Sequence, residues 1–198
     1  MNETRPEPIE TILQGLGQNK RIFEYFKAND LEKEYTTCGR FPKMLYKQHR
    51  DWTCSIACIR TLISDLISDV PDEDYFVNKY KLKPSPYYTK DIREIGMLEP
   101  YCNEIIYSAD LDQQKISLHS LQQLLRENYF IMAECLYNVA HWIVIMGYCA
   151  VRNARDTEEH RLFVYDPYYD LVRLLIADEF DSMWHDVDGH VKEFIAIK

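Results

Sequence analysis

The sequence has no long hydrophobic run and no excess of positive charge. No uninterrupted apolar stretch approaches the roughly 20 residues that a membrane-spanning helix needs. The formal net charge is −9 and the sequence pI is near 5.2, and no stretch supplies a basic patch that attracts nucleic acid or an anionic membrane surface. Residues 1–10 are polar and acidic and show no secretory signal. We therefore expect a cytoplasmic protein with neither a membrane span nor a nucleic-acid partner.

Glycine-rich phosphate loops and a disulfide framework are absent as well. Neither G-x-x-x-x-G-K-[ST] nor G-x-G-x-x-G occurs, so nucleotide chemistry has no support. The cysteines follow no framework spacing, and three lie in apolar runs, as reduced buried thiols do. A second cysteine pair at zinc-ligand spacing is missing, so we expect neither a metal nor a cofactor. The six cysteines are Cys38, Cys54, Cys58, Cys102, Cys135 and Cys149.

The 198 residues suit one domain with a sizeable core and an appendage. Residues 1–34 are predicted to be the appendage, because their apolar positions fall into two short helical groups separated by Gly15 and Gly17. We expect this helical appendage to fold back on the domain, since its apolar side chains need burial. Residues 35–198 then form the main domain, which begins with a linker or a short strand over residues 38–42.

The first half of the main domain is predicted to be helical. Apolar residues after Cys54 recur at steps of three and four, which is typical of an amphipathic helix. This helix is expected to end between Ser68 and Pro71, where proline breaks the pattern. Further helices are predicted over residues 72–80, over residues 90–97 with Thr89 as the cap, and over residues 118–127 with Ser117 as the cap.

The second half changes to the pattern of β-strands. Short apolar runs, rich in β-branched and aromatic residues, replace the helical spacing. Two of these runs flank the turn sequence Asp166-Pro167-Tyr168-Tyr169-Asp170 and indicate a hairpin. Strands are predicted over residues 129–135, 141–148, 162–165, 171–175 and 193–197, with a helix over residues 178–184. Helices followed by an antiparallel sheet define the α+β class.

The first chemical signal lies in the stretch Gln48-His49-Arg50-Asp51-Trp52-Thr53-Cys54. Asp51 and Thr53 are residue types that cap helices, so Cys54 is expected in the first helical turn. A helix N-terminus carries roughly half a positive charge and favours the thiolate form of a cysteine placed there. Cys54 is therefore a candidate nucleophile, although a cysteine in such a helix is also found as a small buried hydrophobe.

Two titratable residues stand at the ends of apolar strands in the second half. His141 opens one strand, and Asp166 closes another. If these strands pair, the Asp166 carboxylate can accept the imidazole N–H while the other ring nitrogen faces a thiol. Gln48 is placed to give a side-chain N–H to an oxyanion, beside the backbone N–H of Cys54. The plainer interpretations are a strand-edge histidine, a turn-forming aspartate and a loop amide.

These residues together resemble the C39-like branch of the papain-like cysteine peptidases, which includes the leader-cleaving peptidase domains of bacteriocin exporters. The Trp52–Cys58 segment is also similar to the guanylyl-cyclase-domain family, a C39-like group. The resemblance extends over residues 45–197. The matching segments are Gln48, Cys54 with Ala57 and Cys58, His141-Trp142-Ile143-Val144, and Asp166-Pro167.

The resemblance implies a papain-like cysteine peptidase fold and a role for each matching residue. It implies Gln48 as the oxyanion donor, Cys54 as the nucleophile, His141 as the general base and acid, and Asp166 as the orienting carboxylate. The chain departs from the family at Ser55, where the family has glycine, and at Thr53, where it has aspartate.

We therefore expect a cysteine-dependent hydrolase that cleaves peptide or isopeptide bonds in a peptide or protein substrate. Two alternatives stay open. The same machinery can pass the acyl group to an amine, as a ligase or a transglutaminase does. A non-catalytic module of the same fold can instead hold a peptide without cleaving it.

Overall fold

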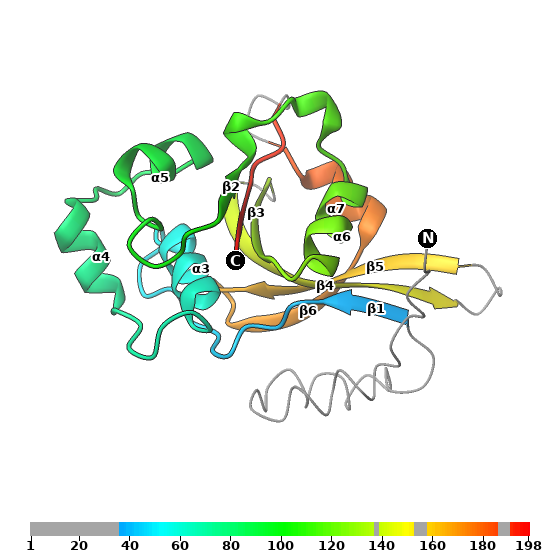
Figure 1. Ribbon diagram of the computed structural model, residues 1–198, viewed down its shortest axis with the longest axis horizontal. Coiled ribbons are helices and arrows are strands. Elements are labelled where there is room, and N and C mark those ends of the chain that lie inside the picture. Colours follow the sequence, from blue (N-terminus) through cyan, green and yellow to red (C-terminus); the bar gives the residue numbers. More distant parts are fainter. Residues whose placement is uncertain (1–35, 137–138, 153–157, 186–190) are drawn as a thin grey trace.

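The computed structural model describes residues 36–136, 139–152, 158–185 and 191–198 (Figure 1). The α+β class is confirmed, because N-terminal helices pack on an antiparallel sheet. The predicted appendage at residues 1–34 lies outside the described residues. No helix among the described residues has the length and apolar character that crossing a membrane requires.

The helices come first along the chain and most of the strands follow. The helices of the described residues are α3 (Cys54–Ile63), α4 (Glu73–Tyr80), α5 (Thr89–Ile95), α6 (Leu118–Arg126) and α7 (Ala177–Met183), with 3₁₀ segments η1 (Ser108–Asp110) and η2 (Gln113–Lys115). The strands are β1 (Thr36–Gly39), β2 (Ile105–Tyr107), β3 (Phe130–Leu136), β4 (Ala140–Arg152), β5 (Glu158–Asp166), β6 (Leu171–Ile176) and β7 (Phe194–Ile197).

The described strands form one sheet around the long strand β4. Six of them pair antiparallel in the order β2-β7-β3-β4-β5-β6, and β1 pairs with β4 outside this order. β3 pairs with β4 up to Ile145, while β5 holds the opposite edge of β4 from Val144 onward. β1 pairs from Gly147, so it continues along the edge that β3 has left.

A close backbone approach joins β1 to β4. The register of β4 is irregular between Ile145 and Gly147, and the Met146 carbonyl there accepts the Arg40 N–H at 2.9 Å. A Cβ at Gly39 would lie 2.7 Å from this carbonyl oxygen and 3.2 Å from Gly147 Cα. Since both atoms belong to the backbone, this junction requires glycine at position 39.

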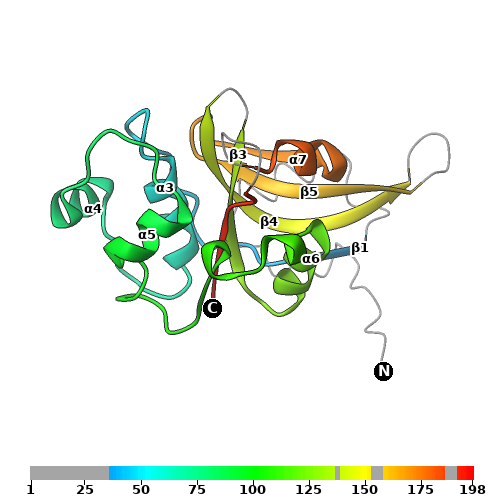
Figure 2. The same cartoon turned by 90° about the horizontal axis from the view of Figure 1, so that it is seen from above.

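Both faces of the sheet are covered, which explains the nearly continuous apolar strands. Alternate residues of a strand point to opposite faces. Trp142 and Val144 share a core with the apolar side of α3, whereas Ile143 and Ile145 share a second core with α6 and α7. α6 and α7 lie together over the sheet in Figure 1, and α3, α4 and α5 form a group at one end of the molecule in both Figure 1 and Figure 2.

The helix that begins at Cys54 ends earlier than predicted. α3 stops at Ile63, not near residues 68–71. The Ser64 hydroxyl donates to the Thr61 carbonyl at 2.8 Å and accepts the Met44 N–H at 3.1 Å. A serine hydroxyl that bonds nearby backbone competes with helix propagation. A contact with a segment 20 residues earlier in the chain thus helps to set this helix end.

The cap predicted for α5 is also wrong by one residue. Thr89 is the first residue of α5, and Tyr88 is the N-cap, whose N–H donates to the Asp91 carboxylate at 3.0 Å. The Thr89 N–H donates instead to Glu193 Oε2 at 2.7 Å, a partner 104 residues away. A long-range carboxylate therefore takes the role that a local side chain was predicted to have.

The other predicted elements are present within a few residues at their ends, and β4 extends as far as Arg152. The segment over residues 38–42, left open as a linker or a strand, contains the end of β1. The short strand β2 was not predicted, since three residues show too little alternation to be recognised.

Candidate active site

Cys54 is the first residue of α3, as predicted, and its side chain is partly exposed. Every later residue of this helix is buried. The side chains of Cys58, Cys102, Cys135 and Cys149 are buried, whereas that of Cys54 is partly exposed. Burial raises the pKa of Cys58 well above its ordinary value, and the charge of Cys54 adds to this effect. Cys58 is thus a core thiol one turn behind an accessible one.

The local structure before Cys54 is a turn held by Thr53. Thr53 occupies the N-cap position, but its side chain makes no capping hydrogen bond. Its hydroxyl donates to the Arg50 carbonyl at 2.9 Å and accepts the Arg50 N–H at 3.2 Å. Thr53 therefore fixes the turn that leads into α3 and leaves the helix N-terminus beside Cys54 uncapped by its side chain.

The register of the sheet brings His141 to Asp166. The pairing of β4 with β5 ends at Val144 and Tyr165, so His141 and Asp166 both lie at the same end of this strand pair. His141 Nε2 lies 2.9 Å from Asp166 Oδ1. The aspartate is fully buried and the histidine is 9% exposed. Two residues 25 positions apart thus form a buried acid–imidazole pair.

The Cys54 thiol is a neighbour of the same imidazole, because hydrogen bonding and charge from Cys54 help to raise the pKa of His141. His141 therefore interacts with a thiol on a helix and with a carboxylate on a strand. The structure brings these three predicted residues together.

The environment keeps the imidazole protonated at neutral pH. Burial by itself lowers the pKa of His141, but the hydrogen bonds to Asp166 and Cys54 and the charges of both groups outweigh burial and raise this pKa from 6.5 to about 9. Burial alone raises the pKa of Asp166, but the hydrogen bond and charge of His141, with a smaller contribution from Arg173, lower it below 3.8. The pair is thus an imidazolium and a carboxylate.

Further contacts to Asp166 come from residues that the sequence did not single out for this role. Asp166 Oδ1 accepts the Tyr168 N–H at 3.0 Å, as an aspartate in an Asx-turn does. Arg173 Nη1 lies 3.8 Å from Oδ2, and its guanidinium also lies over the Tyr169 ring at 4.7 Å. The Asp-Pro turn pattern indicated the first contact, but nothing local indicated the arginine, which reaches Asp166 from β6.

Gln48 is 5% exposed and is tied to both halves of the site. Its backbone N–H donates to the Pro167 carbonyl at 3.1 Å, next to Asp166. Its side-chain Nε2 donates to the Arg50 carbonyl at 2.8 Å, the same oxygen that Thr53 Oγ1 contacts before Cys54. One amide N–H is used in this bond, and a primary amide has a second.

Ser55 is 1% exposed, so its side chain is packed within the protein. The described residues contain no group of three or more His, Cys, Asp or Glu side chains arranged to hold a metal ion.

Comparison with family models found no family that matches the chain, and comparison with curated proteins found no significant match. Support for the function of this protein therefore comes from the geometry of the site around Cys54, His141 and Asp166.

Proposed function

We propose that this protein is a cysteine-dependent hydrolase of the papain-like, C39-like type, which cleaves peptide or isopeptide bonds. The observation that supports this most is that His141 bonds the Asp166 carboxylate at 2.9 Å and also has the partly exposed Cys54 thiol as a neighbour that raises its pKa. A histidine that only fills space in a core needs neither a carboxylate partner nor an accessible thiol. The set of thiol, imidazole and carboxylate is that of an activated nucleophile.

The proposed reaction begins with ionised Cys54 and protonated His141. The thiolate attacks the carbonyl carbon, a C–S bond forms, and the π electrons of the carbonyl move to its oxygen. The tetrahedral intermediate then breaks its C–N bond, and the proton on His141 goes to the departing amine. Water attacks the resulting thioester, His141 takes a proton from this water, and the acid product leaves as the thiolate is restored. Asp166 keeps its proton-free state and holds the imidazole in place throughout.

The oxyanion of the intermediate needs donors that are already in position. We assign this role to the backbone N–H of Cys54, at the N-terminus of α3, and to the second amide N–H of Gln48. The bond from Gln48 to the Arg50 carbonyl supports the assignment, because it fixes the amide and leaves one N–H for a substrate. The α3 dipole acts in the same direction.

We also propose that the protein has the papain-like fold and a cytoplasmic location. A cysteine-bearing helix packed on an antiparallel sheet, which carries the histidine and the aspartate, is the arrangement expected of a papain-like fold over residues 45–197. Cys58, Cys102 and Cys135 are buried free thiols, which supports a reducing, cytoplasmic location.

Alkylation kinetics test the proposed function directly. Native protein is treated with iodoacetamide at pH 6, and the modified cysteine is identified by peptide mass spectrometry. We expect Cys54 to react at least about tenfold faster than glutathione, because a catalytic cysteine beside a histidine is an activated nucleophile. In the His141→Gln variant, Cys54 should react no faster than glutathione. In the Cys54→Ala variant, the modified peptide should be absent from the mass spectrum. A native Cys54 that reacts no faster than glutathione would falsify the hydrolase and leave the peptide-binding module.

Cleavage is then measured with a library of internally quenched peptides. Wild-type protein should cleave members of this library, and Cys54→Ala should cleave none. Transfer to an added amine, such as hydroxylamine or glycine amide, distinguishes acyl transfer from hydrolysis by the mass of the product. A product that carries the amine in place of water would favour the transferase alternative.

A further inference from the structure

The segment that carries Gln48 is held on the helices by buried side chains. The Tyr46 N–H donates to Thr61 Oγ1 on α3 at 3.1 Å, and the His49 N–H donates to Glu73 Oε2 on α4 at 2.8 Å. Thr61 is fully buried, and Glu73 is 1% exposed. These side chains satisfy backbone donors on either side of Gln48, so they fix the path of the chain there.

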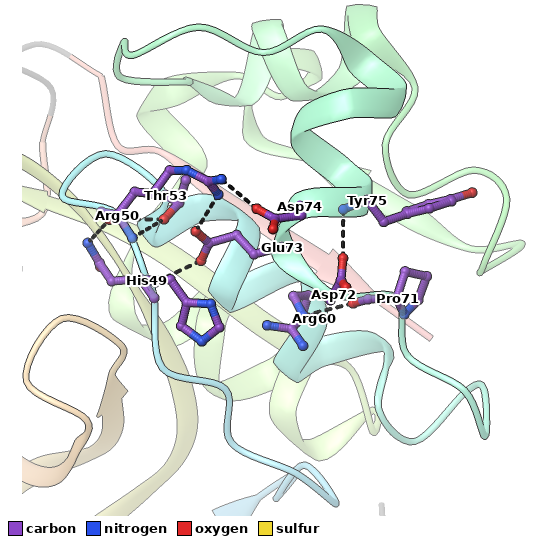
Figure 3. Close-up of polar contacts among 10 residues, drawn as sticks. His49, Arg50, Thr53, Arg60, Pro71, Asp72, Glu73, Asp74 and Tyr75 are labelled. Carbon is purple, nitrogen blue, oxygen red and sulfur yellow. Dashed lines mark hydrogen bonds and ion pairs between the residues drawn. The ribbon is translucent and has the colours of Figure 1, made fainter.

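Glu73 also holds the side chain of Arg50 (Figure 3). Its Oε1 accepts from Arg50 Nη1 at 3.0 Å, while Oε2 takes the His49 N–H. Asp74 is the second carboxylate on the same guanidinium, but its side chain is 67% exposed. An ion pair in water contributes little, whereas removing one partner of a buried pair is strongly destabilising.

The Arg50 carbonyl is where this network meets the candidate active site. It accepts Gln48 Nε2 at 2.8 Å, Thr53 Oγ1 at 2.9 Å and the Thr53 N–H at 3.2 Å. Cys54 follows directly after Thr53. Arg50 thus connects Glu73, through its side chain, to Gln48 and the start of α3, through its backbone.

α4 itself does not need the Glu73 carboxylate as its cap. Asp72 is the N-cap of α4, and its Oδ1 accepts the Tyr75 N–H at 2.7 Å. Glu73 is the first residue of the helix and directs both oxygens to the segment 49–50 instead. Because the buried Glu73 carboxylate bonds outside its own helix with both oxygens, its role is to stabilise the segment 49–50.

We propose that Glu73 is a positioning residue that acts through Arg50 to hold the Gln48 amide in place for the oxyanion. The proposal rests on the hydrolase function proposed above. An oxyanion donor must lie within about half an ångström of its productive position, because it binds charge that develops only in the transition state. Loss of the Glu73 carboxylate leaves the Arg50 side chain with the exposed Asp74 alone and removes the acceptor of the His49 N–H, so the anchor of the Gln48 amide is no longer held in place.

Two small reagents separate this role from general structural damage. p-Nitrophenyl acetate acylates a thiolate through a tetrahedral intermediate with an oxyanion, whereas iodoacetamide alkylates it by displacement and forms no oxyanion. We expect Glu73→Gln to lower the acylation rate of Cys54 about tenfold while the alkylation rate stays within about twofold. Gln48→Ala should give a larger selective loss, on the order of 10². The double variant should be no slower than Gln48→Ala alone, since both changes act on the same donor.

Asp74→Asn is the matched control, because it removes the exposed carboxylate from the same guanidinium. It should leave both rates within about twofold. If Glu73→Gln does not fold, Arg50→Gln provides the same test from the partly exposed side of the pair. Unchanged acylation in the folded variant, or an equal loss of acylation and alkylation, overturns the proposal. A wild type without Cys54 acylation instead overturns the hydrolase itself, so the two failures are distinguishable.

Discussion

His141 Nε2 lies 2.9 Å from Asp166 Oδ1, and neither group has more than a small exposed area. The bond crosses from β4 to β5 and occupies one of the two ring nitrogens of His141. A buried carboxylate in this position fixes the orientation of the imidazole and stabilises its protonated form. The orientation and the pKa of His141 should therefore depend on Asp166.

We expect the rate of Cys54 acylation to fall as pH rises through about 9, because His141 loses the proton that the leaving group needs. The measurement is kcat/KM on a peptide amide substrate between pH 5 and pH 10. An amide is required, since an activated ester leaves without protonation. A rate that falls near pH 6.5 instead would contradict the raised pKa of His141.

The Asp166→Asn variant serves as the comparison for this pH profile. Its alkaline limb should move to lower pH, because the hydrogen bond to a carboxylate and its negative charge raise the pKa of His141. We expect kcat/KM at pH 7 to fall by about 10²-fold, the lower part of the range for general acid–base catalysis. An unchanged limb would show that Asp166 does not set the protonation of the imidazole.

The same pKa shifts predict how stability depends on pH. The pKa of His141 is raised on folding, so its stabilising effect is complete below its ordinary value of 6.5 and is lost as pH rises through about 9. The pKa of Asp166 is lowered, so its effect is complete above 3.8 and is lost as pH falls through the lowered value. The difference in Tm between wild type and His141→Gln should therefore be largest near pH 5–6 and shrink by pH 9.5. A Tm difference that grows toward pH 9.5 would contradict the raised pKa of His141 in the folded protein.

Tyr168 is expected to contact the leaving-group side of a substrate. Its ring meets the His141 ring edge-on at 6.4 Å between centroids, and 47% of the residue is exposed. In the proposed reaction His141 protonates the departing amine, so a side chain beside His141 is close to the substrate residues that follow the cleaved bond. Tyr168→Ala should raise KM about 2- to 10-fold, the equivalent of one aromatic contact, with little change in kcat.

Leu111→Ala is the control for this variant, since Leu111 is 43% exposed and lies between η1 and η2. It should change neither KM nor kcat. The backbone N–H of Tyr168 that bonds Asp166 is kept in the alanine variant, so the pH profile should also be unchanged. A shifted profile would mean that the ring acts on the imidazole and not on the substrate.

Gly39→Ala is predicted to destabilise the sheet by about 1–3 kcal/mol. The added Cβ would meet the Met146 carbonyl oxygen at 2.7 Å and the Phe41 ring at 2.9 Å, and the carbonyl is fixed by β4. Urea unfolding measures the loss, with the exposed Ser85→Ala as a control that should stay within about 0.5 kcal/mol of wild type. A stability equal to that of wild type would mean that β1 separates from β4 at little cost.

Elements with a clear hydrophobic period could be predicted from the sequence. The apolar steps after Cys54 predicted α3, and the β-branched runs around His141 and Asp166 predicted β4 and β5. Cys54, His141 and Asp166 were predicted as candidates because each stands where an element was expected to begin or end, whereas Gln48 was predicted from its spacing to Cys54. The ends of elements were less predictable, since long-range partners set the end of α3 and the start of α5.

The sequence by itself determined the α+β order of elements and the positions of a thiol, an imidazole and a carboxylate at the ends of elements, because periodicity and capping act between near neighbours. Only the tertiary structure decided that Asp166 takes Nε2 and that Arg50 joins the buried Glu73 to Gln48. These bonds connect residues from separate elements, and their partners are chosen by strand register and by how the helices pack. No local pattern encodes that choice, because it is made when the whole core forms.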